Sequence, residues 1–155
     1  MKLITYRKNT GPVLTGVVEG DRVLDITAWI AAQPVPAEAQ QHHARAGVSA
    51  APGGIMRWLQ LGSESIELLA LHVHSSLVSP ETKFDLLNDA QLYAPVPRPG
   101  KIIGVGRNYA DHAKETGVLP FENPRIIFKA SSSVIAPGVP VPRPHKVTKM
   151  DFEVE

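Results

Sequence analysis

The most informative part of the chain is its last third, which reads KIIGVGRNYADHAKETG (residues 101–117), NPRIIFKASSSVIAPG (123–138) and KVTKMDFEVE (146–155). The run KIIGVG is short, apolar and bounded by turn residues, which predicts a buried strand, and RIIFKAS predicts a second strand. Between them, Asn108 is a suitable helix N-cap and Gly117 stands where helices commonly end. We therefore expect a helix of about two turns between the two strands.

This short helix contains a histidine and a glutamate that can act as a pair. His112 and Glu115 are three residues apart and therefore share a helix face. A carboxylate beside an imidazole fixes its tautomer and stabilises the imidazolium, as a water-activating general base requires. A surface His–Glu pair has the same spacing, and spacing alone favours that simpler interpretation.

The segment DFEVE predicts a strand with Asp151, Glu153 and Glu155 on one face, because alternate side chains of a strand point the same way. Converging carboxylates repel one another unless a cation neutralises them, and oxygen ligands suit Mg²⁺, Mn²⁺ or Ca²⁺ better than zinc. An ordinary acidic face in contact with water is the alternative. Lys129 in the preceding strand faces either an anionic substrate or solvent.

The first hundred residues predict a small β-rich domain with helices. Residues 2–27 hold three β-rich runs separated by Asn-Thr-Gly and Glu-Gly-Asp turns, as in an antiparallel meander. Helices are expected over 28–33, 54–62 and 63–76. Thr27 and Ser63 are the expected N-caps of the first and third of these helices.

In the third helix the apolar side chains Ile66, Leu69 and Val73 are expected to share the buried face, which Leu68 and Leu71 broaden. The histidines of this region do not form a metal pair by spacing. His72 and His74 are two residues apart, so they point to different sides of a helix. His42 and His43 fall in a polar loop, and surface or packing roles are favoured for all four.

A proline-rich connector, LYAPVPRPG at 92–100, divides the chain, because a helix cannot run through it. We predict an N-terminal domain over 1–94 and the start of a second domain over 95–155. The pentapeptide PVPRP recurs at 140–144, but one recurrence does not make a repeat architecture. The GVG at 104–106 lacks the third glycine of a dinucleotide fingerprint.

Composition limits the kind of protein this is. The chain has 155 residues, 43% of them hydrophobic, and its 16 basic residues nearly cancel 15 acidic ones. No basic run suggests nucleic acid or a membrane surface as partner, which leaves small molecules. The absence of cysteine excludes disulfides and thiolate metal sites, and no signal-like stretch begins the chain, so we expect a cytoplasmic protein.

The order of the three C-terminal segments is more specific than any one of them. KIIGVGRNYADHAKE, then NPRIIFKASSSVIAPG, then DFEVE resembles the fumarylacetoacetate hydrolase family, and GRNYADH is especially similar to its acylpyruvase-type members. The resemblance covers residues 101–155 closely. It implies an α+β protein whose small β-rich N-terminal domain precedes the first part of a mixed β-roll, left incomplete in this chain.

The resemblance also implies residue roles. Glu153 and Glu155 match the family's glutamate metal ligands for Mg²⁺ or Mn²⁺, whereas Asp151 matches a variable position. His112 and Glu115 match the pair that activates water, on a segment that closes over substrate. Lys129 and Arg107 are the candidate substrate-binding residues.

The implied activity is metal-dependent cleavage of a carbon–carbon bond in β-diketo or 2-oxo acids, by a homodimer. Hydrolysis of acylpyruvate or fumarylpyruvate type, oxaloacetate decarboxylation and isomerase or lyase chemistry of the same family stay open, as does a non-catalytic binding module. The family's third metal ligand, an aspartate, lies on a later strand that this chain does not contain. We therefore expect the isolated chain to be inactive or nearly so.

Overall fold

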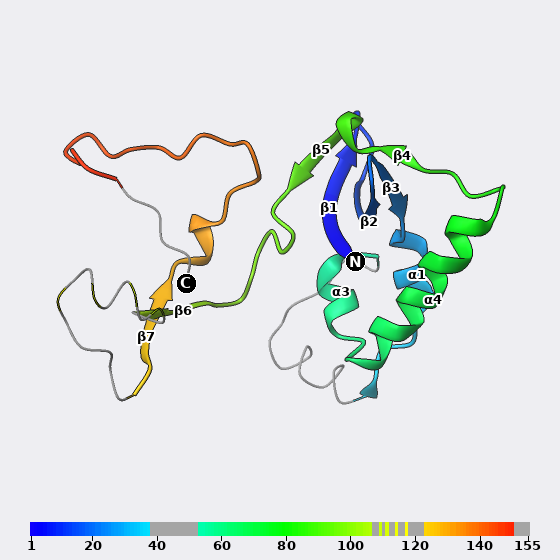
Figure 1. Cartoon of the computed structure of the whole chain (residues 1–155), viewed down its shortest axis with the longest axis horizontal. Helices are drawn as coiled ribbons and strands as arrows, with labels where there is room; N and C mark the ends of the chain where they lie inside the picture. The colour runs from blue at the N-terminus through cyan, green and yellow to red at the C-terminus, as the bar shows by residue number, and fades with distance from the viewer. Residues whose placement is uncertain are drawn as a thin grey trace. The chain divides into compact units, whose positions relative to one another are not determined.

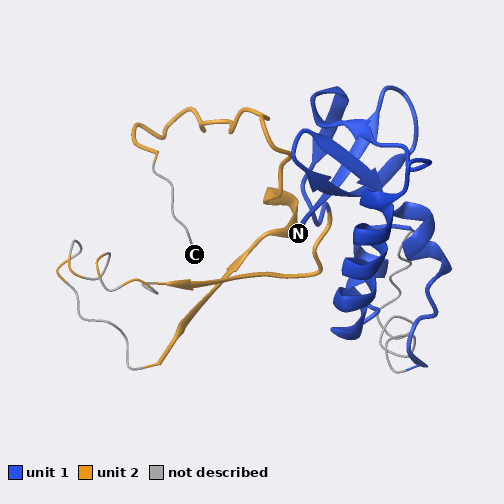
Figure 2. Cartoon of the chain, turned by 45° about the vertical axis from the view of Figure 1, so that its right-hand side comes forward, with its two compact units in different colours: residues 1–97 blue, residues 98–155 orange. Residues whose placement is uncertain are grey.

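The computed structural model of the chain describes residues 1–37, 53–106, 109, 111, 114, 117 and 123–150. The chain divides into two compact units, Met1–Pro97 and Arg98–Glu155 (Figure 2). The domain boundary expected after residue 94 stays a prediction. None of the described helices is long and apolar enough to cross a membrane.

The first unit is built on a five-stranded antiparallel sheet with the strand order β4-β3-β2-β1-β5 (Figure 1). The strands are β1 (Lys2–Lys8), β2 (Val13–Glu19), β3 (Arg22–Asp25), β4 (Asp85–Leu86) and β5 (Ala90–Tyr93). The meander expected over residues 2–27 is confirmed, since β1 pairs with β2 and β2 with β3. Gly20 has a φ of 64° at the second turn, a conformation that glycine adopts without steric cost.

Strands β4 and β5 were not expected from the sequence. Strand β4 has only two residues and is separated from β5 by the 3₁₀ turn Leu87–Asp89 (η1), so neither strand shows an alternation long enough to recognise. Strand β5 pairs with β1 and includes Leu92 and Tyr93, the first two residues of the predicted proline-rich connector. The extended connector therefore begins after Tyr93.

Three helices, α1 (Thr27–Ala32), α3 (Ile55–Leu59) and α4 (Glu64–Val78), gather beyond one end of this sheet (Figures 1 and 2). Thr27 is not the N-cap of α1: Ile26 holds that position, and the Thr27 hydroxyl instead accepts a hydrogen bond from the Thr15 N–H at 2.9 Å. Ser63 does stand at the N-cap of α4, but its hydroxyl caps no backbone group. The predicted N-cap at Thr27 is therefore wrong, whereas Ser63 has the predicted position but makes no capping hydrogen bond.

The core of the first unit joins strands to helices. Its buried cluster consists of Val17, Leu24, Ile26, Ile30, Leu69 and Val73. Leu69 and Val73 were expected on the buried face of α4, but Ile66 is 49% exposed, and Ser65 takes its place in the interior. Ser65 can be buried because its hydroxyl donates a 2.6 Å hydrogen bond to the Gly62 carbonyl.

The second unit contains an antiparallel two-stranded sheet of β6 (Ile102–Gly106) and β7 (Arg125–Lys129), followed by the 3₁₀ turn Ser131–Ser133 (η2). Both strands were expected from the sequence. The Ser133 hydroxyl and N–H donate to the Ala130 carbonyl and close the turn. The architecture is α+β, as predicted.

Candidate active site

Of the predicted site residues, only Lys129 lies within the described part of the chain. The predicted base and its partner, the second substrate-binding residue and both metal ligands lie outside the described residues: His112, Glu115, Arg107, Glu153 and Glu155. The structure describes the two strands that flank these residues in the sequence. Strand β6 precedes the segment with Arg107, His112 and Glu115, and β7 lies between that segment and the two glutamates. Lys129 ends β7 and is directly opposite Ile102 in β6.

The two faces of this sheet differ sharply in chemistry. Ile103 is opposite Phe128, and Val105 is opposite Ile126, so these four large apolar side chains share one face. Ile103 is 53% exposed and Phe128 is 71% exposed. Within the described residues this face is therefore an apolar surface without a cover.

The other face carries positive charge. Lys129, Ile127 and Arg125 alternate along β7, and their partners in β6 are Ile102, Gly104 and Gly106. The space over Gly106 is filled by Ile127, since a side chain at this glycine would come within 3.0 Å of the Ile127 side chain. The feature of this face that suits a carboxylate-bearing molecule is therefore its two cationic side chains.

Arg125 was missed as a candidate when the sequence was read. It lies on the same face as Lys129, four residues away along the strand, and both side chains are exposed. The signal was present in the alternation of RIIFK, which places the first and last residues on one side. We add Arg125 to the candidate residues for binding an acidic substrate.

The predicted helix between β6 and β7 is described at only a few positions. Asp111 and Lys114 have helical backbones, and the Lys114 ammonium lies 3.2 Å from the Asp111 carboxylate. Gly117 has a φ of 65°, and its N–H donates to the Lys114 carbonyl at 3.1 Å. A glycine in this conformation is typical of a helix C-terminus, as expected here.

Among the described residues, no group of three or more histidine, aspartate or glutamate side chains could hold a metal ion. His72 has a packing contact instead: its ring stacks on Trp29 with centroids 5.4 Å apart and an interplanar angle of 16°. Burial lowers the pKa of His72.

A buried tyrosine is the most perturbed titratable group of the first unit. The Tyr6 hydroxyl is inaccessible to solvent and donates to Asp85 at 2.9 Å, while Lys8 contacts the other Asp85 oxygen at 2.5 Å. The hydrogen bond from Lys8 is the main cause of the lowered Asp85 pKa, and burial is the main cause of the raised Tyr6 pKa. A tyrosine held neutral in this way joins β1 to β4 and is unsuited to proton transfer near neutral pH.

Comparison with known protein families gives a match within the second unit. Residues 101–155 match the model of the family described as "Fumarylacetoacetate (FAA) hydrolase C-terminal". The chain belongs to the fumarylacetoacetate hydrolase family. The matched segment begins immediately before β6 and contains every predicted site residue.

Curated members of this family match the chain over limited lengths. The mitochondrial oxaloacetate tautomerase Fahd2a of Rattus norvegicus is 47% identical over 62 residues, 40% of this chain and 20% of the relative. The mitochondrial oxaloacetate tautomerase FAHD2A of Bos taurus is 30% identical over 105 residues, 67% of this chain and 32% of the relative. In both comparisons the match spans less than a third of the relative's length.

A solved structure resembles most of the chain. A maleylpyruvate hydrolase from Sphingobium sp. SYK-6 matches 87% of this chain and 40% of its own, with 26% identity and a TM-score of 0.53. A second structure of that enzyme, in complex with manganese(II) and pyruvate, has a TM-score of 0.52 and 24% identity. These matches support the same fold, including the N-terminal unit that the family match does not cover.

Proposed function

We propose that this chain is part of a divalent-metal-dependent enzyme that cleaves a carbon–carbon bond in a β-diketo or 2-oxo acid of acylpyruvate or fumarylpyruvate type. The family match over residues 101–155 carries the proposal, because it contains the candidate base, the candidate metal ligands and the cationic strand in one segment. The structural likeness to a maleylpyruvate hydrolase supports this substrate class. Substrate would be a small acid bearing a negative charge.

The donor set fits a hard divalent cation. Glu153 and Glu155 supply carboxylate oxygens, which suit Mg²⁺ or Mn²⁺, and manganese(II) is present in the related maleylpyruvate hydrolase. When bound, the metal would act as a Lewis acid that stabilises negative charge on the oxygen atoms of the 2-oxo acid. Two carboxylates do not complete an octahedral shell, so further ligands are required.

The remaining residues would bind substrate and move a proton. Lys129 and Arg107 would neutralise the substrate carboxylate. His112, held in one tautomer by Glu115, would take a proton from water as the water oxygen bonds to the distal carbonyl carbon. The carbon–carbon bond then breaks, and the pyruvate-type fragment leaves as an enolate that recovers a proton. The Asp111–Lys114 pair on the same short segment helps this segment to hold its helical turn.

Oxaloacetate chemistry is the second candidate function. The relatives from rat and cattle are named oxaloacetate tautomerases, and keto–enol exchange uses the same enolate without attack by water. Decarboxylation of oxaloacetate would also form this enolate. An isomerase or lyase of the family and a non-catalytic module are the remaining alternatives.

We further propose that the isolated chain is inactive, because the residues present supply too few metal ligands and leave the apolar face of β6–β7 without a cover among the described residues. A homodimer remains the proposed assembly of an active form. A cytoplasmic location remains a proposal as well, although the relatives from rat and cattle carry mitochondrial names.

The test compares the isolated chain with a longer form that supplies the remaining strands of the catalytic domain. Acetylpyruvate cleavage by the longer form should depend on Mn²⁺ or Mg²⁺, and His112→Ala should lower kcat by about 10²- to 10⁴-fold, the usual contribution of a general base. His74→Ala, at an exposed position on α4, is the matched control and should leave turnover unchanged.

Unchanged turnover in the His112→Ala variant would remove the proposed base. Turnover by the isolated chain would contradict the proposed inactivity. Oxaloacetate serves as the second substrate: tautomerisation without cleavage of acetylpyruvate would replace the leading function by the second candidate.

A further inference from the structure

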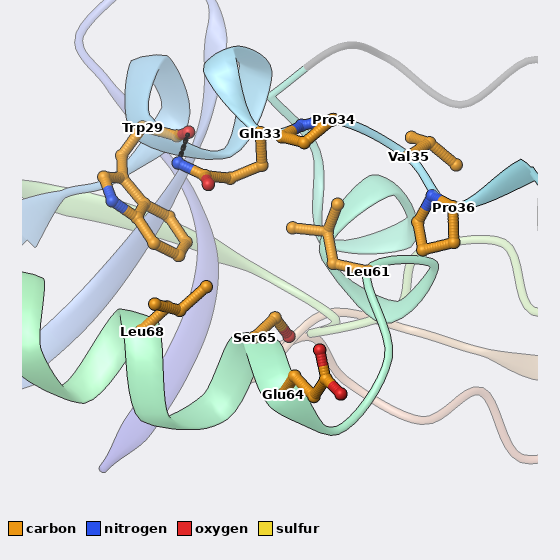
Figure 3. Close-up of a pocket in the computed structure, with 9 residues that line it drawn as sticks. All are labelled: Trp29, Gln33, Pro34, Val35, Pro36, Leu61, Glu64, Ser65 and Leu68. Carbon is orange, nitrogen blue, oxygen red and sulfur yellow. Dashed lines mark hydrogen bonds between the residues drawn. The ribbon is translucent and has the colours of Figure 1, made fainter.

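A pocket of about 300 Å³ lies in the N-terminal unit, between the end of α1, the turn at Leu61 and the first turns of α4 (Figure 3). Its walls are largely apolar, formed by Trp29, Leu61, Leu68 and two prolines, Pro34 and Pro36. This volume is at the lower end of the range for small-molecule pockets, roughly 300–1,000 Å³. The pocket lies outside the segment that matches the family, so the proposed function leaves it unexplained.

The aromatic wall of the pocket is held in place by contacts of its own. Trp29 stacks on the His72 ring, and its backbone carbonyl accepts a 3.1 Å hydrogen bond from the Gln33 side-chain amide. In Figure 3 the six-membered ring of Trp29 is turned toward the pocket and the ring nitrogen away from it. Leu68 faces the same space and is 53% exposed, so it retains apolar surface for a ligand to cover.

The charge of the lining is negative. The Ser65 hydroxyl donates to the Gly62 carbonyl at 2.6 Å, and one N–H of the Gln33 amide donates to the Trp29 carbonyl at 3.1 Å. Glu64 is the only ionisable group among the described lining residues, and its carboxylate has no ion pair within the described part of the chain. The polar end of a complementary ligand is therefore a donor with positive charge.

Arg57 on α3 does not change this balance. The Arg57 side chain donates to the Gln33 backbone carbonyl at 2.8 Å and is not part of the lining. An acid such as the proposed substrate would be repelled by the Glu64 carboxylate. The pocket thus selects against the ligand class proposed for the catalytic segment.

We propose that this pocket binds a small free amine with an apolar or aromatic body, whose ammonium group pairs with Glu64 while its body lies between Trp29, Leu61 and Leu68. The site adds a ligand-binding function to the N-terminal unit. It does not rest on the proposed catalytic function, and its test involves no turnover.

The test uses three probes that share one aromatic body: phenethylamine, phenethyl alcohol and phenylpropionate. Calorimetric titration of the wild-type chain near neutral pH should give saturable binding of the amine with Kd on the order of 1 mM. The alcohol should bind about three- to tenfold more weakly, because it lacks the charge that pairs with a partly exposed carboxylate. Phenylpropionate should not bind measurably.

Paired variants on α4 separate the contributions of charge and of apolar contact. Glu64→Gln should reduce amine affinity to that of the alcohol, whereas Glu67→Gln, an exposed acid outside the lining, should not change it. Leu68→Ala should weaken amine and alcohol alike. Leu71→Ala, which removes a leucine that is 67% exposed and outside the lining, should leave both unchanged.

The three-probe comparison requires no variant, so it decides the proposal even if a substitution impairs folding. Equal affinity for the amine and the acid would overturn the proposal, as would the absence of saturable amine binding. Loss of amine selectivity in Glu67→Gln but not in Glu64→Gln would likewise contradict it. Because neither metal nor the catalytic segment takes part, these outcomes are distinguishable from failure of the proposed enzyme activity.

Discussion

The two units of the chain differ in how completely each buries its own apolar side chains. In the N-terminal unit, Tyr6, Val17 and Ile30 are fully buried, and Val17 and Ile30 belong to the cluster that joins the sheet to the helices. In the C-terminal unit, Phe128 is 71% exposed on a two-stranded sheet whose apolar face has no cover among the described residues. The unit that matches the family is therefore the one whose described apolar side chains are less buried.

This difference follows from elementary energetics. Burying an aliphatic side chain contributes about 1.5–3 kcal/mol, and a unit with many such residues can offset its loss of conformational entropy. An isolated two-stranded antiparallel sheet is only marginally stable in water, because it has no third strand or helix against which to bury its apolar side chains. We infer that the N-terminal unit supplies most of the chain's stability and the second unit most of its chemistry.

The largest expected contrast comes from truncating one large apolar side chain in each unit. Ile30→Ala leaves a cavity in a closed core and should lower the free energy of unfolding by about 2–5 kcal/mol. Phe128→Ala should change it by less than about 0.5 kcal/mol, since most of that ring already contacts solvent. Urea unfolding followed by circular dichroism measures both. An equal cost for the two variants would mean that the ring of Phe128 is packed.

A smaller effect is expected from the polar contact that joins β1 to β4. Asp85→Asn should reduce the stability of the first unit by on the order of 1 kcal/mol, because the amide loses the negative charge and keeps only one of the two acceptor oxygens that Tyr6 and Lys8 use. The folded state lowers the pKa of Asp85 from 3.8, so its contribution is present above pH 3.8 and is lost as the pH falls through the lower folded value. Lys8 has a raised pKa, so its contribution persists up to pH 10.5 and is lost above that value.

Acid unfolding curves of the wild type and the Asp85→Asn variant give the comparison. The variant should show a shallower loss of stability below pH 4. Tyr6→Phe retains the contact between Lys8 and Asp85 and should therefore retain most of the pH dependence. An identical acid transition in the wild type and Asp85→Asn would contradict the assigned role of this carboxylate.

The sequence predicted the elements whose pattern is local. The β1–β3 meander and the strands β6 and β7 have clear alternation or apolar runs between turn residues, and all were found. The short strands β4 and β5 were missed because their pairing with β3 and β1 depends on contacts distant in the sequence. The burial of Ser65 in place of Ile66 on α4 was likewise decided by tertiary packing rather than by helix periodicity.

The candidate site was predictable only in part. The order of the His112–Glu115 pair and the Glu153–Glu155 pair identified the family, although each pair alone was ambiguous. Arg125 was not predicted as a site residue. It lies on the face of Lys129 because both residues belong to β7 and are separated by an even number of positions. Spacing within one strand cannot define a complete coordination shell, since that shell collects ligands from several segments.

Mn²⁺ binding to this chain tests the central claim most directly. Electron paramagnetic resonance titration should detect weak binding to the wild type, because two carboxylates provide an incomplete shell. The double variant Glu153→Gln/Glu155→Gln should lose that binding, and Glu64→Gln in the N-terminal unit should retain it. Wild-type Mn²⁺ affinity in the double variant would contradict the assignment of the metal site to the end of this chain.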